Sequence, residues 1–403
     1  MGGLVLYGIN YAPETTGIAP YTTALAEHWA ESHRVSVVTG FPHYPAWRTS
    51  ANDRRMWAHE TRNGARVLRR RHYVPSRQSA LRRAAYEASF LASGALARCE
   101  RPDAVVGVVP SLSGGVLARL AAARWHVPYG LIIQDLMAPA AAQSGISGGG
   151  HAARVTAVIE RCALRRAQSV AIVSEAFRPY LLSNGVPAAR ISILPNWTHI
   201  RGPSADRTAT RIRMGWRSDY IIVLHAGNMG LKQGLEQVVD AAKAVPVGLP
   251  VRFVLMGDGS QRALLEERGK NVGALSFLPF QPEAEVSDIL AAADVLLVSE
   301  RSSVVDMSLP SKLTSYLVAG RPILAAVRLD GATAAEVTRA GAGVIVAPDS
   351  PGDLLQAVGD LAARPDAMQA YGDAGRGYAA TALGTSAAFA RADTFLAGLL
   401  GPA

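Results

Sequence analysis

The chain has 403 residues, of which 49% are hydrophobic and 18% are charged, and its formal net charge is +9. It is too long for one ordinary domain and too apolar to be disordered, so we expect two packed domains. Its apolar runs end well before the ~18 residues that a membrane helix needs, no basic leader precedes the first strand, and two cysteines cannot form a disulfide framework. These features predict a soluble, unprocessed protein of the cytoplasm.

Short runs rich in Val, Ile and Leu alternate along the chain with longer, alanine-rich segments of helical spacing. This alternation is typical of buried parallel strands that are joined by helices. The expected strands of the first half cover residues 4–9, 35–39, 66–70, 104–109, 131–134, 170–173 and 191–194. Those of the second half cover residues 220–225, 251–256, 275–277, 295–299, 322–326 and 343–346. The predicted fold class is α/β, with two Rossmann-like doubly wound domains that face each other across a cleft.

A polar stretch at residues 201–219 separates the two halves and indicates the domain boundary. We expect a first domain over residues 1–198, a second over residues 199–378, and a C-terminal helix within residues 379–403 that packs back on the first domain. Residues 141–150 are small and rich in glycine, which predicts a mobile loop.

Residues 48–101 carry the positive charge, because they hold thirteen arginines against four acidic residues. Such a block attracts polyanions, phosphorylated substrates or anionic lipids, although a solvated surface is an equal alternative. The arginines that we expect at a membrane surface are Arg69, Arg70, Arg71, Arg77, Arg82 and Arg83. The last three lie on or just before a helix whose Leu81, Ala85 and Ala88 face either the domain or a bilayer.

In open α/β sheets, ligands bind beyond the carboxyl ends of the strands. After the first strand of the second domain, residues 225–234 (HAGNMGLKQG) lead into a helix. Glycines such as Gly227 let the backbone approach an anion, amides at the helix start donate to it, and Lys232 adds a charge, which together describe a diphosphate cradle. The alternative is a tight turn with an exposed lysine. The spacing matches neither a GxGxxG nor a Walker loop, which disfavours a hydride cofactor and an ATPase.

Other strand ends of the second domain carry weaker signals, at residues 257–259, 279–281 and 299–300. The segment LPSKLTSYLVAGRP is more informative. A helix that starts near Ser311 would direct its free amides and Lys312 into the same crevice before Gly320 ends it.

In the first domain, residues 11–21 follow the opening strand as a loop that enters a helix, with Gly17 near its start. His43 and Asp135 follow later strands, where catalytic groups lie in many enzymes, although each could as well be a cap or a packing feature. The sequence has no Asp-x-Asp pair and no His/Cys cluster with ligand spacing, so we expect no metal.

Ten segments, in order, span nearly the whole chain: NYAPETTG, VVTGFPHYP, IIQDL, IVSEAF, ILPNW, HAGNMGLKQGLEQV, GDGSQR, LPFQP, ADVLLVSE and LPSKLTSYLVAGRP. In this order the chain resembles the retaining glycosyltransferases of the GT-B fold, and among them the colanic-acid and O-antigen glycosyltransferases of family four. The resemblance implies that the second domain binds a nucleotide-sugar, with a UDP-sugar as the expected donor, and that the first binds the acceptor. It also implies front-face transfer with retention and no cofactor besides the nucleotide-sugar co-substrate.

The catalytic candidates from the strand ends and the resemblance are Lys232, Lys312, His43 and Asp135. The expected donor-binding residues are Gly17, Gly227, Asn228, Met229, Gly257, Asp258, Gly259, Pro279, Phe280, Gln281, Glu300, Ser311 and Ser315. The expected acceptor-binding residues are Glu14, Thr16, Tyr44 and Glu175.

The chain departs from the family pattern at three places. The positions of the family's glutamate pair are Met307 and Ser315 here, which puts the ribose or sugar contacts of those carboxylates in question. Asn228 takes the approximate place of the usual arginine before the phosphate-binding lysine, and either Lys312 or Arg301 could restore that charge. The NWxD ending of the first domain reads NWTH, and we have no explanation for His199.

The sequence therefore predicts an enzyme that transfers a sugar from a nucleoside diphosphate to a hydroxyl group, in cell-surface glycan assembly. Glycosylation of a small soluble natural product and a nucleotide-sugar epimerase on the same fold are alternatives. Nucleic-acid binding through residues 48–101 is disfavoured, because no RNA- or DNA-binding module is recognised there. The expected partners are the donor, a glycan, lipid-linked or small-molecule acceptor, and an anionic membrane that residues 48–101 contact peripherally at the inner leaflet.

Overall fold

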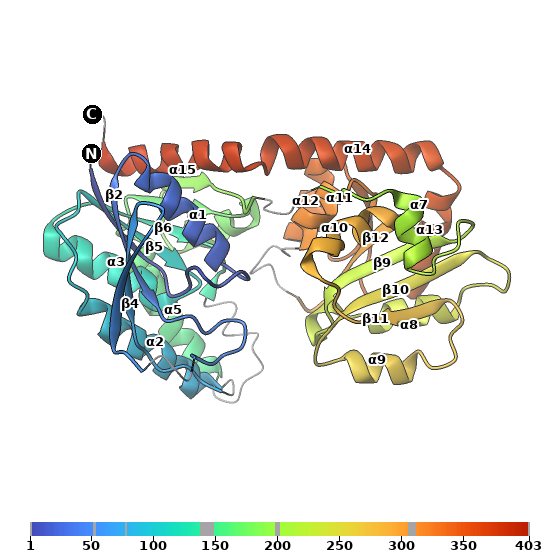
Figure 1. The fold of residues 1–403 in the computed structure, drawn as a ribbon, viewed down its shortest axis with the longest axis horizontal. Coiled ribbons are helices and arrows are strands. Elements are labelled where there is room, and N and C mark those ends of the chain that lie inside the picture. The colour runs from blue at the N-terminus through green and yellow to red at the C-terminus, as the bar shows by residue number, and fades with distance from the viewer. Residues whose placement is uncertain are drawn as a thin grey trace. The chain divides into compact units, whose positions relative to one another are not determined.

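The computed structural model describes residues 2–50, 54–76, 79–137, 149–197, 202–304 and 312–401. The chain forms two compact units: Met1–Pro195 with Ala388–Ala403, and Asn196–Ala387. Each unit is built on a parallel or mainly parallel sheet with helices on both faces (Figure 1), which confirms the predicted α/β class. The division falls just before the predicted boundary after residue 198.

Within the described residues, the first unit holds an eight-stranded sheet in the order β3-β4-β2-β1-β5-β6-β7-β8. Its strands are β1 (Gly3–Tyr7), β2 (Arg34–Gly40), β3 (Trp57–Arg62), β4 (Ala65–Arg70), β5 (Ala104–Val109), β6 (Tyr129–Ile133), β7 (Ser169–Ile172) and β8 (Ile191–Ile193). Every pairing is parallel except that of β3 with β4. The central strand β5 is buried along its whole length, as expected for a sheet with helices on both faces.

The edge strand β3 was not among the predicted strands. Its sequence, WAHETR, is mostly polar and exposed, so it lacks the apolar run that marks buried strands. The signal that could have revealed it is the turn Asn63-Gly64, where both residues have positive φ. This pair is the preferred two-residue connection of an antiparallel hairpin.

The helices of the first unit are α1 (Ala19–Ala30), α2 (Ala80–Ala95), α3 (Leu112–Trp125), α5 (Gly149–Leu164), α6 (Arg178–Ser183) and α15 (Thr385–Leu400), with 3₁₀ turns η1 (Glu175–Phe177) and η2 (Ala188–Arg190). On one face, α3 packs on β5 and lies between α2 and α5. This approach needs glycine in α3, because a Cβ on Gly114 would lie 2.8 Å from the Val108 carbonyl oxygen.

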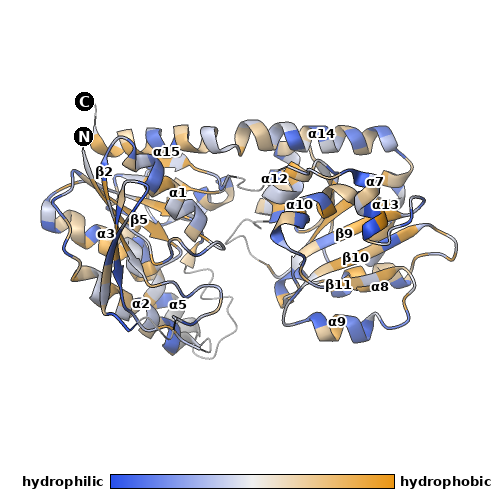
Figure 2. Cartoon of the chain, viewed as in Figure 1, coloured by the Kyte–Doolittle hydropathy of each residue, from blue (hydrophilic) through white to orange (hydrophobic). Residues whose placement is uncertain are grey.

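The second unit holds a six-stranded, fully parallel sheet within the described residues, in the order β11-β10-β9-β12-β13-β14. Its strands are β9 (Ile221–Asn228), β10 (Val251–Asp258), β11 (Leu275–Leu278), β12 (Val295–Ser299), β13 (Ile323–Ala326) and β14 (Gly343–Val346). Its helices are α7 (Arg207–Arg213), η3 (Leu231–Gln233), α8 (Glu236–Lys243), α9 (Arg262–Arg268), α10 (Glu283–Ala292), α11 (Lys312–Ala319), α12 (Ala332–Ala340), α13 (Pro351–Ala362) and α14 (Pro365–Ala382). The central strands are among its most hydrophobic parts (Figure 2) and separate two apolar cores, one under α10, α11 and α12 and the other under α8 and α13.

Two helices, α14 and α15, close the described chain, and α15 lies within the range 379–403 that was expected for a C-terminal helix. Helix α14 ends at Ala382 and α15 begins at Thr385, beyond Gly384. Helix α15 packs on the first unit, where the ring of Phe389 stacks on His28 at 4.1 Å between centroids and Asp393 pairs with the same histidine at 2.9 Å. In the part of the chain that the structure describes, no helix combines the length and apolarity needed to cross a bilayer.

Candidate functional site

The ends of β9 and β10 approach each other closely in the second unit. Gly227, at the end of β9, has a φ of +124° and lies opposite Gly257 in the parallel register. A Cβ on Gly257 would lie 1.9 Å from the carbonyl oxygen of Gly227, so the approach requires glycine. The amide of Met229, whose side chain is buried, then donates to the Asp258 carbonyl at 2.7 Å. These contacts fix the backbone where the predicted diphosphate cradle begins.

The loop after β9 is held by bonds from its own side chains and from β12. The Gly230 amide donates to Oε1 of Gln233 at 3.0 Å, and the Ser299 hydroxyl donates to the Gln233 carbonyl at 2.6 Å. The Arg301 amide donates to the carbonyl of Lys232 at 3.0 Å. The exposed side chain of Lys232 therefore extends from a backbone that the neighbouring strand holds in place.

Lys312 reaches the same turn from the first residue of α11. Its Cε and Nζ atoms both lie 3.7 Å from the point where a Cβ of Gly227 would be. Burial lowers the pKa of Lys312 to about 8, while the Glu300 carboxylate acts in the opposite direction. The structure thus brings together two of the predicted donor-site residues, Gly227 and Lys312, which are far apart in the sequence.

His225 is the partner of Lys312 that sequence analysis did not single out. It is fully buried near the end of β9, and the Lys312 ammonium donates to its Nε2 at 3.4 Å. Burial, and secondarily the Lys312 charge, hold the pKa of His225 well below its ordinary value. The imidazole therefore stays neutral and can accept a hydrogen bond from the ammonium. The sequence did carry one signal for this residue, because a histidine inside the apolar run IIVLHAG is unusual in a buried strand.

Two arginines near the site have structural partners. The Arg301 guanidinium pairs with Glu236 at 2.6 Å, so of the two cations considered for the missing arginine, Lys312 is the one beside Gly227. Arg262, another residue that sequence analysis missed, donates from α9 to the Gly257 carbonyl and, at 3.3 Å, to the Leu278 carbonyl. It thereby links the carboxyl ends of β10 and β11.

Three of the predicted donor-binding residues, Pro279, Phe280 and Gln281, follow β11. Phe280 is 64% exposed, and Nε2 of the Gln281 side chain donates to the Pro279 carbonyl at 3.1 Å. On the adjacent strand, the exposed carboxylate of Asp258 accepts from the Gly259 amide at 2.7 Å. The aromatic face of Phe280 is available for stacking at this edge of the sheet.

Other predicted donor residues are placed by β12 and α11. Glu300 follows β12, and its carboxylate accepts from the Thr333 hydroxyl at 2.9 Å. Ser315 is partly buried on α11. The predicted Ser311, together with Met307 and His199, lies outside the described residues.

In the first unit, Glu14 organises the loops that follow β1 and β2. Its Oε1 atom accepts from the amides of His43 and Tyr44 at 2.7 and 2.9 Å, and its Oε2 accepts from the Asn10 side chain at 2.8 Å. The carboxylate is almost fully buried by these contacts. Glu14 therefore joins two of the loops at which acceptor residues were predicted.

His43 is enclosed rather than open to solvent, with 3% of its surface exposed. Its Nδ1 donates to the Phe41 carbonyl at 2.9 Å, and its Nε2 accepts from the Tyr86 hydroxyl at 3.0 Å. The rings of Trp47 and His72 pack around it. Both ring nitrogens of His43 therefore have protein partners. This environment favours the alternative that His43 is a packing feature over a role in contact with substrate.

Gly17, predicted to bind the donor, has a φ of +65°. A Cβ there would lie 3.1 Å from the ring of Tyr44, which is itself 37% exposed. The neighbouring Thr16 is exposed. Gly17 therefore lets the loop after β1 pass close to an aromatic ring at the predicted acceptor side.

Asp135 and Glu175 follow the adjacent strands β6 and β7. Asp135 is partly buried at the end of β6, and Glu175 pairs with Arg178 at 2.5 Å. These two acidic residues share the carboxyl edge of the sheet with the loops of Glu14 and His43.

A hollow of about 390 Å³ lies beside the Glu14 loops. It is lined by Pro13, Phe41, Pro42, Arg55, Glu60, Thr61, Arg62 and Arg69. Pro13 and Pro42 directly precede Glu14 and His43, so the network of Glu14 shapes one wall. The lining combines apolar rings with guanidinium groups and one carboxylate, a mixture that suits a polar ligand with flat apolar faces.

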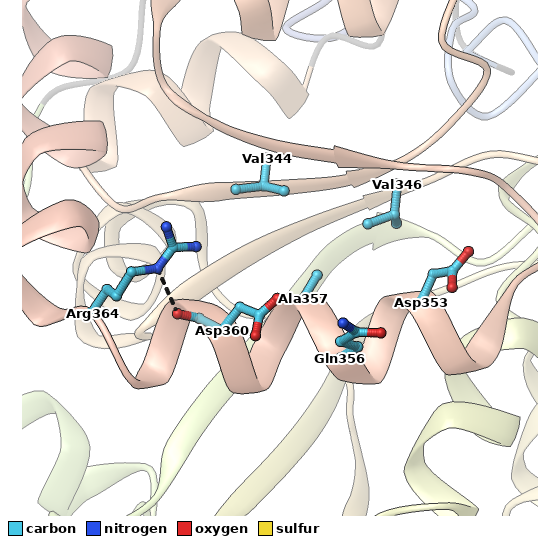
Figure 3. A pocket seen from close by; sticks show the side chains of 7 residues that line it. All are labelled: Val344, Val346, Asp353, Gln356, Ala357, Asp360 and Arg364. Atoms are coloured by element: carbon cyan, nitrogen blue, oxygen red, sulfur yellow. Dashed lines mark hydrogen bonds between the residues drawn. The ribbon is translucent and has the colours of Figure 1, made fainter.

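A second hollow, of about 260 Å³, lies between β14 and α13 (Figure 3). Asp353, Gln356 and Asp360 line it from α13, and Arg364 donates to the Asp360 carbonyl at 3.1 Å. No predicted site residue lines this hollow. Among the described residues, no group of three His, Cys, Asp or Glu side chains could hold a metal ion.

Residues 16–197 match the glycosyl transferase 4-like domain, and residues 220–364 match the glycosyl transferases group 1 family. The chain is 34% identical over 337 residues to WcaI of Escherichia coli (strain K12), a glycosyl transferase assigned to colanic acid biosynthesis, covering 79% of this chain and 81% of that protein. The chain belongs to the family-four glycosyltransferases of the GT-B fold.

Solved structures agree with this fold at low identity. The sucrose-phosphate synthase of Thermosynechococcus elongatus covers 98% of both chains with a TM-score of 0.74 and 18% identity. HepE of Anabaena, in complex with UDP, covers 99% of this glycosyltransferase and 100% of its own chain, with a TM-score of 0.71 and 14% identity. HepE has also been solved with UDP-glucose. At these identities the likeness concerns the fold alone.

Proposed function

We propose that this glycosyltransferase moves a sugar from a UDP-sugar to an acceptor hydroxyl with retention of the anomeric configuration, in the assembly of a cell-surface polysaccharide. The observation that carries the proposal is the position of the Lys312 ammonium against Gly227 at the carboxyl end of β9. An anion site forms there from Lys312, from Gly227 with its positive φ, and from the exposed Lys232 on the next loop. This is the edge at which α/β sheets bind their ligands.

Breaking the bond between the sugar and the diphosphate leaves negative charge on the diphosphate. Cations that already lie where this charge develops stabilise the transition state more than the ground state. Lys312 is held there by His225, which stays neutral and therefore does not repel the ammonium group. A bound diphosphate favours the charged ammonium, so donor binding raises the pKa of Lys312 again. We propose that Lys232 and Lys312 perform this role without a divalent metal.

We place the nucleotide base over Phe280, because this exposed ring lies at the edge of the same sheet and aromatic faces stack well on bases. The ligands that are proposed for the second unit are then a base at β11 and a diphosphate at β9. The binding of UDP and UDP-glucose by HepE supports this choice of nucleotide.

The acceptor, we propose, binds the first unit at the hollow beside Glu14. The rings of Pro13 and Pro42, above the buried ring of Phe41, present apolar surfaces on which sugar rings pack, while Glu60 and the arginines offer hydrogen bonds to hydroxyl groups. In this proposal His43 and Glu14 position the loops, and the acceptor contacts come from the hollow and from Tyr44. The relationship to a protein of colanic acid biosynthesis favours a glycan acceptor.

A panel of nucleotide-sugars is the first experiment, with protection against thermal unfolding as the readout, because a bound donor stabilises the native state by mass action. The protecting donor is then incubated with candidate acceptors, and the anomeric proton of the product is assigned by NMR. Release of UDP that depends on the acceptor, with the donor's anomeric configuration in the product, supports the proposal. Acceptor-independent change of the sugar would indicate an epimerase, and an inverted product would contradict retention.

A further inference from the structure

Helix α2 carries an apolar stripe on its outer side. The stripe consists of Leu81, Ala85, Ala88, Ala92 and Leu96. All five are exposed, and the two leucines at its ends are 81% and 73% exposed. The opposite side of the helix is apolar too, because Tyr86 and Phe90 are buried in the core. The sequence left open which way Leu81 faces, and the structure places it away from the domain.

The segment after β4 runs alongside this helix and adds an aromatic side chain. Nε of Arg70 donates to the Ser93 carbonyl at 2.8 Å, and the amide of Tyr73 donates to the Ser89 hydroxyl at 2.9 Å. These bonds fix residues 70–73 along the second half of α2. Tyr73 is 43% exposed beside the stripe.

Two large apolar side chains lie on the other side of the same segment. The Arg71 amide donates to the Met56 carbonyl at 3.0 Å, and Trp57 pairs directly with Arg70 across the β3–β4 ladder. Because directly opposed residues project to the same face of a sheet, Trp57 projects toward the face that α2 covers. Met56 and Trp57 are 62% and 61% exposed.

The charges of this region divide into structural and exposed arginines. Arg69, expected at a membrane surface, is instead 5% exposed: its guanidinium donates to the Ala12 and Gly40 carbonyls and pairs with Glu60. Arg70 is held by Ser93, and Arg77 lies outside the described residues. The prediction for Arg69 was therefore wrong, because its guanidinium is buried against the loops that follow β1 and β2, whereas Arg70 stays partly exposed.

Arg54, Arg55 and Arg82 are exposed and adjoin Met56 and Leu81 in the chain. The acidic groups of the region are engaged elsewhere. Glu60 pairs with Arg69, and Glu87 accepts from the hydroxyls of Ser111 and Ser113. The surface that α2, residues 70–73 and residues 54–57 form is therefore apolar and basic at once. We name it the α2 surface.

We propose that the α2 surface docks on an anionic lipid bilayer. Basic side chains are attracted to the negative potential of anionic lipids, Trp and Tyr favour the level of the head groups, and exposed leucines enter the acyl boundary. A second copy of the chain fits less well, because a two-fold contact would oppose the arginines of one copy to those of the other. The α2 surface lies in the first unit and shares no residue with the donor site of the second.

Vesicle sedimentation tests this proposal without any measurement of sugar transfer. The intact protein is mixed with vesicles of phosphatidylcholine alone or with 30% phosphatidylglycerol, at low and high salt. We expect binding to the anionic vesicles only, weakened by salt because the attraction is screened. Emission of Trp57 should shift to the blue on binding, and the shift should be missing in Trp57→Phe.

Two variants separate the charge from the apolar stripe. Arg54→Gln/Arg82→Gln should weaken binding about 25-fold, from roughly fivefold for each arginine. Leu81→Ser/Leu96→Ser should weaken it more than tenfold, because each leucine loses its burial in lipid. The matched control in the same unit is Leu120→Ser/Arg166→Gln, which changes an exposed leucine and an exposed arginine outside the α2 surface. It should bind like the wild type.

All substituted side chains are exposed, and thermal unfolding of each variant checks that its fold is kept. No binding of the wild type to anionic vesicles at low salt would overturn the proposal. So would an equal loss in the control variant. Sedimentation velocity without lipid adds one more outcome: a dimer that the leucine variant disrupts would assign the α2 surface to a second copy and not to a membrane.

Discussion

Replacing Lys312 with methionine should stabilise the fold of this glycosyltransferase while it removes activity. The change from an ordinary pKa of 10.5 to about 8 corresponds to about 3 kcal/mol of extra cost for the charged form in the folded state. Because the side chain keeps some contact with water, we expect about 1–3 kcal/mol of this cost to be measurable. Methionine has a similar length and carries no charge, so it fills the same space without the cost. It also removes the hydrogen bond to His225, but this bond is long, at 3.4 Å, and we expect its loss to cost less than the charge does.

The difference in folding stability between Lys312→Met and the wild type should depend on pH. Below pH 8 the lysine is charged in both the folded and the unfolded chain, so the folded state bears the whole cost and the variant is the more stable protein. Between pH 8 and about 10.5 the folded chain loses its proton first, and the cost disappears as the pH rises. The stability advantage of the variant should therefore be largest at pH 7, and the part of it that comes from the lysine charge should vanish above pH 10.5.

Urea unfolding followed by tryptophan fluorescence measures this difference, and Trp216 reports on the second unit because it is buried in that core. The matched control is Lys270→Met, which removes an exposed lysine of the same unit and should change stability by less than about 0.5 kcal/mol. A Lys312→Met protein that is less stable than the wild type at pH 7, or a difference that does not change with pH, would refute the reasoning.

Three further predictions concern catalysis. Lys232→Ala should lower kcat/KM by roughly 10²-fold, because a charge-assisted contact that strengthens as the leaving group ionises contributes ~2–4 kcal/mol to the transition state; near-normal kcat/KM would remove Lys232 from the site. Excess EDTA should leave turnover unchanged, and a loss that Mg²⁺ or Mn²⁺ restores would show that a metal is needed. His43→Ala and Asp135→Asn should each impair transfer but leave UDP binding intact by calorimetry, because both lie in the first unit; weaker UDP binding would assign either residue to the donor.

The strands could be read from the sequence because buried parallel strands carry long apolar runs, as β5 and β12 do. The hairpin strand β3 could not, since its residues face solvent and only the Asn63-Gly64 turn marks it. The end of one strand and the start of a later helix also pointed to Gly227 and Lys312, and the structure places these two residues next to each other.

Side-chain partners were beyond the reach of sequence patterns. Arg69 looked like one of a run of surface arginines, yet its position on β4 directs it inward to two carbonyl groups and Glu60. His43 looked like a catalytic residue at a strand end, yet Tyr86, more than forty positions away, encloses it. Such contacts depend on how helix α2 packs on the sheet, which residue spacing does not specify.

Contact between Lys312 and a bound diphosphate is the claim on which the proposed chemistry rests, and proton uptake on UDP binding tests it most directly. Calorimetry at pH 8.5, in buffers that differ in ionisation enthalpy, measures how many protons enter the complex. The wild type should take up a fraction of a proton, because the diphosphate restores the charge on a lysine whose pKa is about 8. Lys312→Arg, which is always charged, should bind UDP without that uptake. Equal uptake by the two proteins would show that Lys312 does not meet the diphosphate.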